Sequence, residues 1–316
     1  MSQPSLFYWD SQDFDWHHGP ENHPERPARL DAVRAALAPL HSRGLRAMEP
    51  QPIDASWLRR VHCHDYLERL LRLCAFGGGQ LDADTYIVEG TERAALLAAG
   101  AVHDAVLSVL GDQTRRAFCA VRPPGHHARP EGGMGFCILN NVAIGAEVAL
   151  AQPGVERVAI IDFDVHHGNG TQEVFEQRSD VFYASIHQSP CFPSTGSALD
   201  IGFGAGQGSC LNVPVAPGSG DESYLQAWEL IEVALEKYRP QILLVSAGFD
   251  AHQRDPLAEL NVSTEGFAEL SQRIVLAAER ICEGRIVSVL EGGYDLTALA
   301  ESTRAHVEAL MGKGLS

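Results

Sequence analysis

The sequence predicts an α/β fold in a single domain, with one mostly parallel sheet covered by helices on both faces. Two observations predict it. Short β-branched or aromatic runs, each flanked by turn residues, alternate with longer segments of helical periodicity. The strand candidates are also apolar on both faces, as is typical of a doubly covered parallel sheet. The 316 residues contain no internal repeat and no long linker, so we expect one domain over residues 1–316.

The strands and helices can be placed along the chain. Five segments are predicted as buried strands of one sheet: Ala117–Val121, Arg157–Phe163, Val181–Ile186, Gln241–Ala247 and Arg285–Leu290. Three segments between or before them are predicted as helices: Thr91–Leu110, Asp221–Tyr238 and Thr264–Cys282. In the second helix, an apolar side chain recurs every three or four positions from Tyr224 to Leu235, which places these side chains on one face.

The charge balance restricts the binding partners. A formal net charge of -17 opposes nucleic acid and anionic lipid, and it attracts cationic small molecules or Lys-rich peptides. The alternative interpretation is that the negative charge does no more than keep the protein soluble. The Ala-rich segment from Arg93 to Leu110 carries His103 and Asp104, so we expect no segment that reaches the ~20 apolar residues of a membrane span.

The N-terminus and the cysteines indicate a compartment. Met1 to Trp16 has no basic patch followed by an apolar run and a cleavage site, so no secretory signal is expected. The seven cysteines are scattered and form no C-x-x-C pair, which is typical of reduced thiols in a cytosolic protein. We therefore expect a cytoplasmic protein.

Polar residues gather where the predicted strands end. Four such segments follow four different strands: Arg122–His127, Asp162–His167, Ser246–Asp250 and Glu291–Tyr294. In open parallel sheets, ligands bind at the carboxyl ends of the strands. The four segments are therefore expected to meet at one site.

The segment D-F-D-V-H-H-G-N-G predicts a metal site. A period of two would send Asp162, Asp164 and His166 to one side of a strand. An N-cap and a hydrogen-bonded core histidine would explain one acid but not three polar groups in register. Two buried carboxylates side by side need a cation, and Asp250 adds a third. Three ligands with an open position are typical of catalytic zinc, although mixed oxygen and nitrogen ligands also suit iron, cobalt or manganese.

Two further segments supply groups for acid–base chemistry. In R-P-P-G-H-H, the prolines and the glycine fix a turn that aims His126 and His127, and imidazole titrates in the range that amide hydrolysis needs. In E-G-G-Y, two glycines let the backbone place the Tyr294 hydroxyl near a developing oxyanion. Read alone, the histidines would be a solvated loop pair and the tyrosine a packing residue. Beside a metal site, the catalytic interpretation is favoured.

Together these motifs closely resemble the histone deacetylase superfamily, which includes acetylpolyamine amidohydrolases and bacterial histone deacetylase-like amidohydrolases. The match runs from His23–Leu30 (H-P-E-R-P-A-R-L) to Glu291–Tyr294, nearly the whole chain. The resemblance implies an arginase-like α/β domain with a central parallel sheet of eight strands. It also implies zinc-dependent removal of an acetyl or related acyl group from a lysine-type or polyamine amine.

The resemblance implies roles for the motif residues. The zinc ligands would be Asp164, His166 and Asp250; the catalytic groups would be His126, His127, Tyr294 and Asp162, the carboxylate partner of His126. His127 would act as general base and then as general acid, with His126 as electrostatic support. Position 169 is Asn where some members have Asp, and a neutral partner leaves His127 less basic.

The remaining roles that the resemblance implies concern the pocket walls and a second ion. Phe136 and Phe192 would flank the substrate alkyl chain over Gly133 or Gly135, with Leu257 on the rim, Asp84 or Asp82 as the rim carboxylate, and Arg29 near an internal acetate cavity. A structural K⁺ would bind at carbonyls around Asp162, Asp164 and His166 and at the Ser185 hydroxyl. Polyamine specialists can have an acid at the Leu257 position, so Leu257 argues slightly against that specificity.

Several alternatives stay open. A binuclear manganese ureohydrolase would need further Asp ligands and a Gly-Gly-Asp-His segment, which the chain lacks. A binding module that retains an acyl-amine pocket would have no use for a complete set of proton-transfer groups. Within the enzyme interpretation, acetyl-lysine peptides, acetylpolyamines and other small acyl amides remain as substrates. A homo-oligomer that narrows access to the pocket also remains open.

Overall fold

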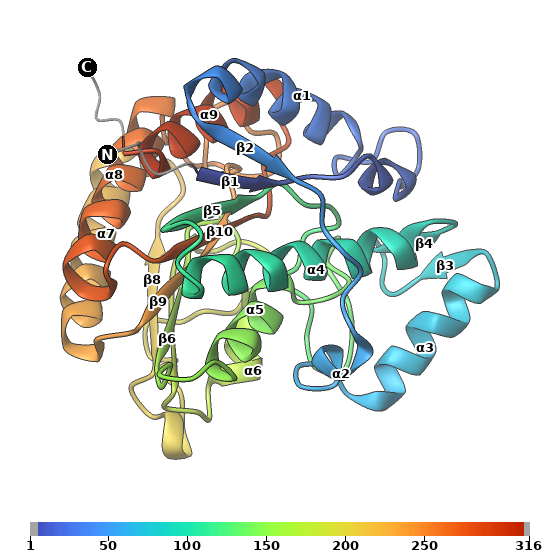
Figure 1. The fold of residues 1–316 in the computed structure, drawn as a ribbon, viewed down its shortest axis with the longest axis horizontal. Coiled ribbons are helices and arrows are strands. Elements are labelled where there is room, and N and C mark those ends of the chain that lie inside the picture. The colour runs from blue at the N-terminus through green and yellow to red at the C-terminus, as the bar shows by residue number, and fades with distance from the viewer. Residues whose placement is uncertain (1–5, 313–316) are drawn as a thin grey trace.

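Eight parallel strands form the central sheet of the computed structural model, which describes residues 6–312 (Figure 1). The strand order is β2-β1-β5-β10-β9-β6-β7-β8. The strands are β1 (Leu6–Trp9), β2 (Leu45–Met48), β5 (Arg116–Cys119), β6 (Val158–Asp162), β7 (Val181–Gln188), β8 (Cys210–Val215), β9 (Ile242–Ala247) and β10 (Ile286–Leu290). The predicted fold is confirmed. The ends of the predicted domain, residues 1–5 and 313–316, lie outside the described residues.

All five predicted strands lie in this sheet, and their bounds differ from the predicted ones by one or two residues. Every residue of β6, β9 and β10 is buried, because helices cover both faces of the sheet. Three strands of the sheet were not predicted. β1 and β2 have only four residues each, and β8 is an edge strand that contains Pro214, so none of them shows the long apolar run of a central strand.

The helices form two layers around the sheet (Figure 1). One layer contains α1 (Ala28–Leu37), α7 (Asp221–Tyr238), α8 (Thr264–Cys282) and α9 (Leu296–Leu310), and the other contains α4 (Thr91–Leu110), α5 (Asn141–Leu150) and α6 (Asn169–Phe175). The three predicted helices, α4, α7 and α8, have the predicted bounds.

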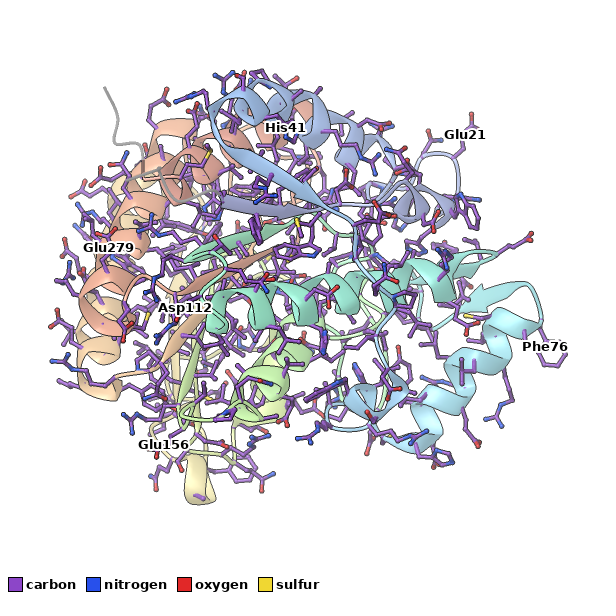
Figure 2. All side chains as sticks on the ribbon, viewed as in Figure 1. Glu21, His41, Phe76, Asp112, Glu156 and Glu279 are labelled. Atoms are coloured by element: carbon purple, nitrogen blue, oxygen red, sulfur yellow. The ribbon has the colours of Figure 1, made fainter. Side chains whose placement is uncertain are left out.

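A smaller lobe stands to one side of the α4 layer in Figure 1. It contains α2 (Ala55–Leu58), α3 (His64–Ala75) and an antiparallel hairpin of β3 (Gly78–Gln80) and β4 (Tyr86–Val88). Short 3₁₀ helices complete the described fold: η1 (Gln12–Trp16), η2 (Ala38–Arg43) and η3 (Gly204–Gly206). Figure 2 shows side chains filling the space between the layers, whereas Phe76, just after α3, points away from the fold and is 87% exposed.

Helix α4 is long and apolar enough to span a membrane by length and composition, which contradicts the expectation that no segment reaches this limit. The polar pair His103 and Asp104 is too small a fraction of the helix to lower its mean hydropathy below that limit. However, 67% of its apolar window is buried inside the protein, where α4 contacts α5, β5 and β10. Its many alanines permit this close packing, and α4 is a core helix of the domain.

A buried histidine of α9 links helix α8 to strand β10 of the sheet. His306 of α9 is fully buried, with its Nδ1 2.7 Å from the Ser271 Oγ of α8 and its Nε2 2.8 Å from the Ser288 Oγ of β10. Burial lowers the pKa of His306 from 6.5 to about 3. The folded protein therefore keeps this imidazole neutral at a pH where the unfolded chain binds a proton.

The free energy of unfolding should fall as the pH falls from about 6.5 towards 4, because the unfolded state then takes up a proton that folded His306 refuses. His306 contributes up to about 1.4 kcal/mol per pH unit to this slope. Urea unfolding of His306→Gln at several pH values should give a slope smaller by this amount. The variant His64→Gln, which removes an exposed histidine, is measured beside it as the control for loss of an imidazole. An unchanged slope in His306→Gln would contradict the assignment.

Candidate active site

Four loops that carry the predicted site residues leave the carboxyl ends of β5, β10, β9 and β6. These four strands are consecutive neighbours in the sheet, so their loops meet at one edge, as predicted. The register places Asp162 at the end of β6 beside Ser246 of β9 and Ser185 of β7. The strand order thus brings together four loops that lie far apart in the sequence.

Three ligand groups converge at the centre of this edge. One ligand atom from each of Asp164, His166 and Asp250 lies within 4.8 Å of the others. His166 Nδ1 is 3.1 Å from Asp164 Oδ1 and 3.2 Å from Asp250 Oδ2. The two carboxylates are 1% exposed, and Asp250 Oδ2 is a buried oxygen without a hydrogen-bond partner in the described part of the chain. A divalent cation fits this set, because it would neutralise both acids and satisfy that oxygen.

Two glycines allow the carboxylates to lie this close to the backbone. A Cβ atom at Gly248 would stand 2.0 Å from Asp164 Oδ2, and one at Gly292 would stand 2.0 Å from Asp250 Oδ2. Any side chain at either position would displace a ligand oxygen. The glycines of S-A-G-F-D and E-G-G-Y are therefore part of the geometry of the ligand group.

The reason given from sequence for the convergence of Asp164 and His166 is wrong, because β6 ends at Asp162 and a strand period of two does not extend beyond it. The segment turns instead through carboxylate-to-backbone hydrogen bonds. Asp162 Oδ1 accepts from Asp164 N at 3.2 Å, and Asp164 Oδ1 accepts from His166 N at 2.9 Å. Val165 N donates to Asp250 Oδ1 at 3.0 Å and so ties the turn to the loop after β9.

The two histidines after β5 lie in contact, with ring centroids 4.0 Å apart, but have different environments. His126 Nδ1 is 3.0 Å from Asp162 Oδ2, and His127 Nδ1 is 2.8 Å from Asn169 Oδ1. Burial alone would lower the pKa of His126, but the charges of Asp162 and Asp164 raise it to about 10. Burial, and then the charge of His126, hold the pKa of His127 well below its ordinary value.

This difference in pKa gives the two rings different protonation states. His126 is an imidazolium at neutral pH, whereas His127 is neutral. The Asn169 Oδ1 can only accept, so His127 carries its hydrogen on Nδ1 and keeps the lone pair on Nε2. His127 is thus arranged as a base.

The buried side chain of Arg29 lies over the ring of Tyr294. The Arg29 guanidinium lies 5.0 Å from the centre of the Tyr294 ring and donates from Nε to Gly293 O at 2.7 Å. Gly292 N donates to Asp164 Oδ2 at 2.8 Å, which attaches this segment to the ligand group. Burial raises the pKa of Tyr294 well above 10, so its hydroxyl keeps its proton. The acetate-cavity role of Arg29 stays a prediction.

Aromatic side chains line the approach to the ligand group. The Phe192 ring is 5.1 Å from that of His127, and the Phe136 ring is 5.8 Å from that of Tyr294. Gly135 has a φ of +54°, and a Cβ there would stand 2.7 Å from the His127 ring and 2.9 Å from that of Phe192. The chain can pass so close to His127 only as glycine. Gly133 lies beside Tyr66 and Leu81 instead.

The rim contains two aspartates with different roles in the turn that joins β3 to β4. Asp82 Oδ1 accepts from Asp84 N at 3.1 Å and from Thr85 N at 2.8 Å, so this carboxylate folds the turn. Asp84 Oδ1 accepts from Thr85 Oγ1 at 3.2 Å. Between the two candidates, Asp84 is the one whose carboxylate does not hold the backbone of the turn, and its role at the rim stays a prediction. Leu257 is 38% exposed.

A buried ion-pair network beneath the site was missed by the sequence reasoning. Glu25 is 1% exposed and binds two fully buried arginines: Arg122 Nη2 lies 2.7 Å from Glu25 Oε2, and Arg29 Nη1 lies 3.2 Å from Glu25 Oε1. The network joins the H-P-E-R segment to the R-P-P-G-H-H turn. Glu25 and Arg29 stand four residues apart in the sequence, which was the available signal.

Ser185, the predicted K⁺ ligand, is buried beside Asp162, with its Oγ 2.9 Å from His187 Nδ1. The potassium site stays a prediction. His126, Cys137 and Glu291 form a second group of potential metal ligands. It is less suited to a cation, because Glu291 Oε2 already accepts from Gly125 N at 2.7 Å and from His126 N at 3.2 Å.

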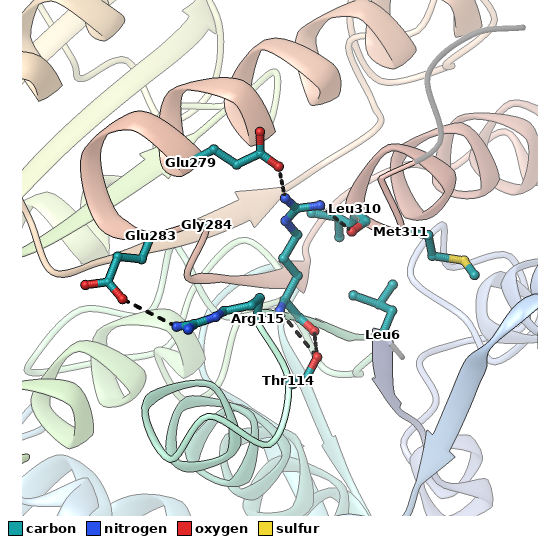
Figure 3. Close-up of a pocket in the computed structure, with 9 residues that line it drawn as sticks. Leu6, Thr114, Arg115, Glu279, Glu283, Gly284, Leu310 and Met311 are labelled. Carbon is teal, nitrogen blue, oxygen red and sulfur yellow. Dashed lines mark hydrogen bonds and ion pairs between the residues drawn. The ribbon is translucent and has the colours of Figure 1, made fainter. Parts of the chain in front are cut away.

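A cavity of about 190 Å³ lies at the opposite edge of the sheet, where β1, β5 and β10 begin (Figure 3). Arg116 lies in its wall, pairs with Glu279 and donates to Leu310 O at 3.0 Å, and Arg115 lies 3.6 Å from Glu283. Its charges are thus paired with each other. Chemistry is expected at the carboxyl ends of parallel strands, so this cavity is not the candidate active site.

Known proteins share this fold and sequence. The histone deacetylase domain model matches residues 23–310. A probable deacetylase of Archaeoglobus fulgidus is 41% identical over 299 residues, which cover 93% of this chain and 83% of that protein. A histone deacetylase-like amidohydrolase of Pseudomonas aeruginosa is 44% identical over 263 residues, which cover 83% of this chain and 69% of that protein.

The solved structures agree. A crystal structure of the HDA15 HD domain has a TM-score of 0.93 and 34% sequence identity, and the match covers 99% of this chain and 89% of that one. The domain match and the two relatives cover most of the chain, including all four loops at the carboxyl edge of the sheet. The chain therefore belongs to the histone deacetylase family.

Proposed function

We propose that the protein is a zinc-dependent amidohydrolase that removes an acetyl or related acyl group from a lysine-type or polyamine amine. Family membership supports hydrolysis of an acyl amide. One observation of the site carries the proposal: the ligand group of Asp164, His166 and Asp250 lies beside one charged imidazole, one neutral imidazole and a protonated phenol. Cleavage of an amide needs a Lewis acid, a base that becomes an acid, and an oxyanion donor.

Asp164, His166 and Asp250 would hold the cation, and a divalent cation there supplies Lewis acidity towards the acyl oxygen and towards water. His127 Nε2 removes the proton from the attacking water and later delivers it to the leaving amine. His126 stays charged beside Asp162 and lowers the basicity of His127, which makes proton delivery to the amine easier. The Tyr294 hydroxyl donates a hydrogen bond to the acyl oxygen as negative charge develops on it.

The pocket walls support a long, unbranched amine chain. Phe136 and Phe192 would flank its methylenes, and Asp84 would accept a hydrogen bond from the substrate at the rim. Leu257 offers no charge to a second amine, which favours an acyl-lysine substrate over an acetylpolyamine. The net charge of -17 would attract either cationic substrate.

Three further proposals accompany this function. A structural K⁺ would bind at the Asp162–His166 turn next to Ser185, where the register brings the two strands together. The seven cysteines are all free, which supports a reducing, cytoplasmic location. A homo-oligomer would narrow the access to the Phe192 and Leu257 rim.

A competition assay on zinc-loaded protein tests the function. Acetyl-lysine peptides, acetylpolyamines and longer acyl-lysines are offered together, and release of free amine is measured. We expect hydrolysis, with acetyl-lysine peptides consumed faster than acetylpolyamines. Asp250→Ala is the control and should release no amine. A wild-type protein that binds zinc but cleaves none of these amides would be a binding module instead.

Tyr294→Phe removes the phenol hydroxyl and keeps the ring. Loss of an oxyanion donor typically lowers kcat about 100-fold to 1000-fold, whereas KM should change little because the ring still packs on Phe136. Steady-state kinetics with an acetyl-lysine peptide measure both constants. Equal kcat values for the variant and the wild type would remove Tyr294 from the mechanism.

Asp84→Ala should raise KM for acetyl-lysine peptides about tenfold, because one charge-assisted hydrogen bond contributes roughly 1.5 kcal/mol. The constant kcat should stay close to that of the wild type, since Asp84 lies outside the ligand group. Asp82→Ala loses the turn rather than the rim contact, so its melting temperature should fall. An unchanged KM in Asp84→Ala would show that this carboxylate does not bind the substrate.

A further inference from the structure

Asp255 is a buried carboxylate that joins two of the active-site loops. It is 8% exposed and follows β9, five residues after Asp250. Its Oδ2 accepts from Tyr294 N at 2.7 Å and from Asp295 N at 3.4 Å. Its Oδ1 accepts from Leu257 N at 3.0 Å. One side chain thus holds the backbone of the phenol residue and that of the rim residue.

Asp255 and Glu291 are held by backbone N–H groups, whereas the other buried acids near the site have a cationic side chain or the ligand group as a partner. Glu25 has two arginines, Asp162 has His126, and Asp164 and Asp250 share the ligand group. Burial and then the charge of Asp250 raise the pKa of Asp255 to about 7. The backbone N–H groups of Tyr294, Leu257 and Asp295 act in the opposite direction and lower this pKa. Burying a carboxylate without a cationic partner adds little to stability, so the three backbone contacts of Asp255 call for an explanation other than stability.

That explanation lies in the segment that carries Tyr294. Two glycines, Gly292 and Gly293, precede the tyrosine, and Gly293 has a φ of +120°. Such a segment has many accessible conformations unless both of its ends are fixed. Arg29 fixes the side before the tyrosine by donating to Gly293 O, and Asp255 fixes the tyrosine itself by accepting from its N–H.

We propose that Asp255 is a positioning residue for the reaction: its carboxylate clamps the Tyr294 backbone, so that the hydroxyl stays aimed at the acyl oxygen, and ties this clamp to the rim at Leu257. The inference rests on the proposed function of Tyr294. An error of about 1 Å in the position of a catalytic group lowers the rate by roughly 100-fold. The backbone hydrogen bond to Asp255 therefore acts on kcat rather than on substrate binding.

The variant Asp255→Asn keeps the size of the side chain but leaves one accepting oxygen, with an NH₂ group on the other side, for the backbone N–H groups of Tyr294, Asp295 and Leu257. We expect kcat to fall at least tenfold, with KM within about threefold of the wild-type value. Adding Tyr294→Phe to this variant should lower kcat far less than it does in the wild type, because the phenol is already misplaced. Asp255→Ser is the second variant, in case Asp255→Asn does not fold.

A second readout does not depend on turnover. In the zinc-loaded protein without substrate, the amide of Tyr294 should exchange its hydrogen at least tenfold faster in Asp255→Asn than in the wild type, measured on peptides covering residues 291–296. Asp221→Asn is the matched control. Asp221 also accepts from a backbone N–H and a hydroxyl, both of Ser263, at the N-terminal ends of α7 and α8. It makes none of the hydrogen bonds that hold the described residues 291–296, so its loss should leave kcat and this exchange unchanged.

Two results would overturn the inference. One is an unchanged exchange rate at Tyr294 in both Asp255 variants. The other is a loss of kcat in Asp255→Asn to which Tyr294→Phe adds its full wild-type effect, because Asp255 would then act independently of the tyrosine. If the wild type cleaves no amide, the proposed function fails, and the exchange measurement still decides whether Asp255 holds the Tyr294 backbone.

Discussion

The burial of two carboxylates against each other is the constraint on which the site depends. Asp164 and Asp250 have almost no exposure, and each accepts one backbone N–H from a neighbouring loop: Asp164 from Gly292, and Asp250 from Val165. These hydrogen bonds leave one Asp250 oxygen unsatisfied. A divalent cation would remove the repulsion and satisfy that oxygen. The same contacts hold the loops after β6, β9 and β10 together. The arrangement of the three ligand groups therefore depends on how these loops pack against one another.

The charges around this group give two neighbouring histidines different protonation states. Two adjacent histidines differ because one faces a carboxylate and the other an amide, and the charge of the first lowers the basicity of the second. The backbone of the Tyr294 segment is fixed by hydrogen bonds with the side chains of Arg29 and Asp255. A third hydrogen bond joins its Gly292 N–H to Asp164. Protonation states and positions are therefore set by long-range contacts across the carboxyl edge of the sheet.

Much of this was predictable from the sequence, for a physical reason. Central parallel strands are buried on both faces, so β6, β9 and β10 appear as apolar runs, and the polar residues after them mark the site. The short strands β1 and β2 and the edge strand β8, which contains Pro214, carry no such signal. The turn from Asp162 to His166 depends on side-chain hydrogen bonds to backbone, which no periodicity reveals. The Glu25–Arg122 pair and the Asp255–Tyr294 contact join residues 97 and 39 positions apart, and only the folded chain brings them together.

The central claim is that Asp164, His166 and Asp250 hold a single divalent cation. Its most direct test is a crystal structure of zinc-loaded protein, with anomalous diffraction recorded on both sides of the zinc absorption edge. One peak should lie about 2.0–2.2 Å from an oxygen of each aspartate and from His166 Nδ1. A peak between His126, Cys137 and Glu291 instead, or none at the first group, would contradict it.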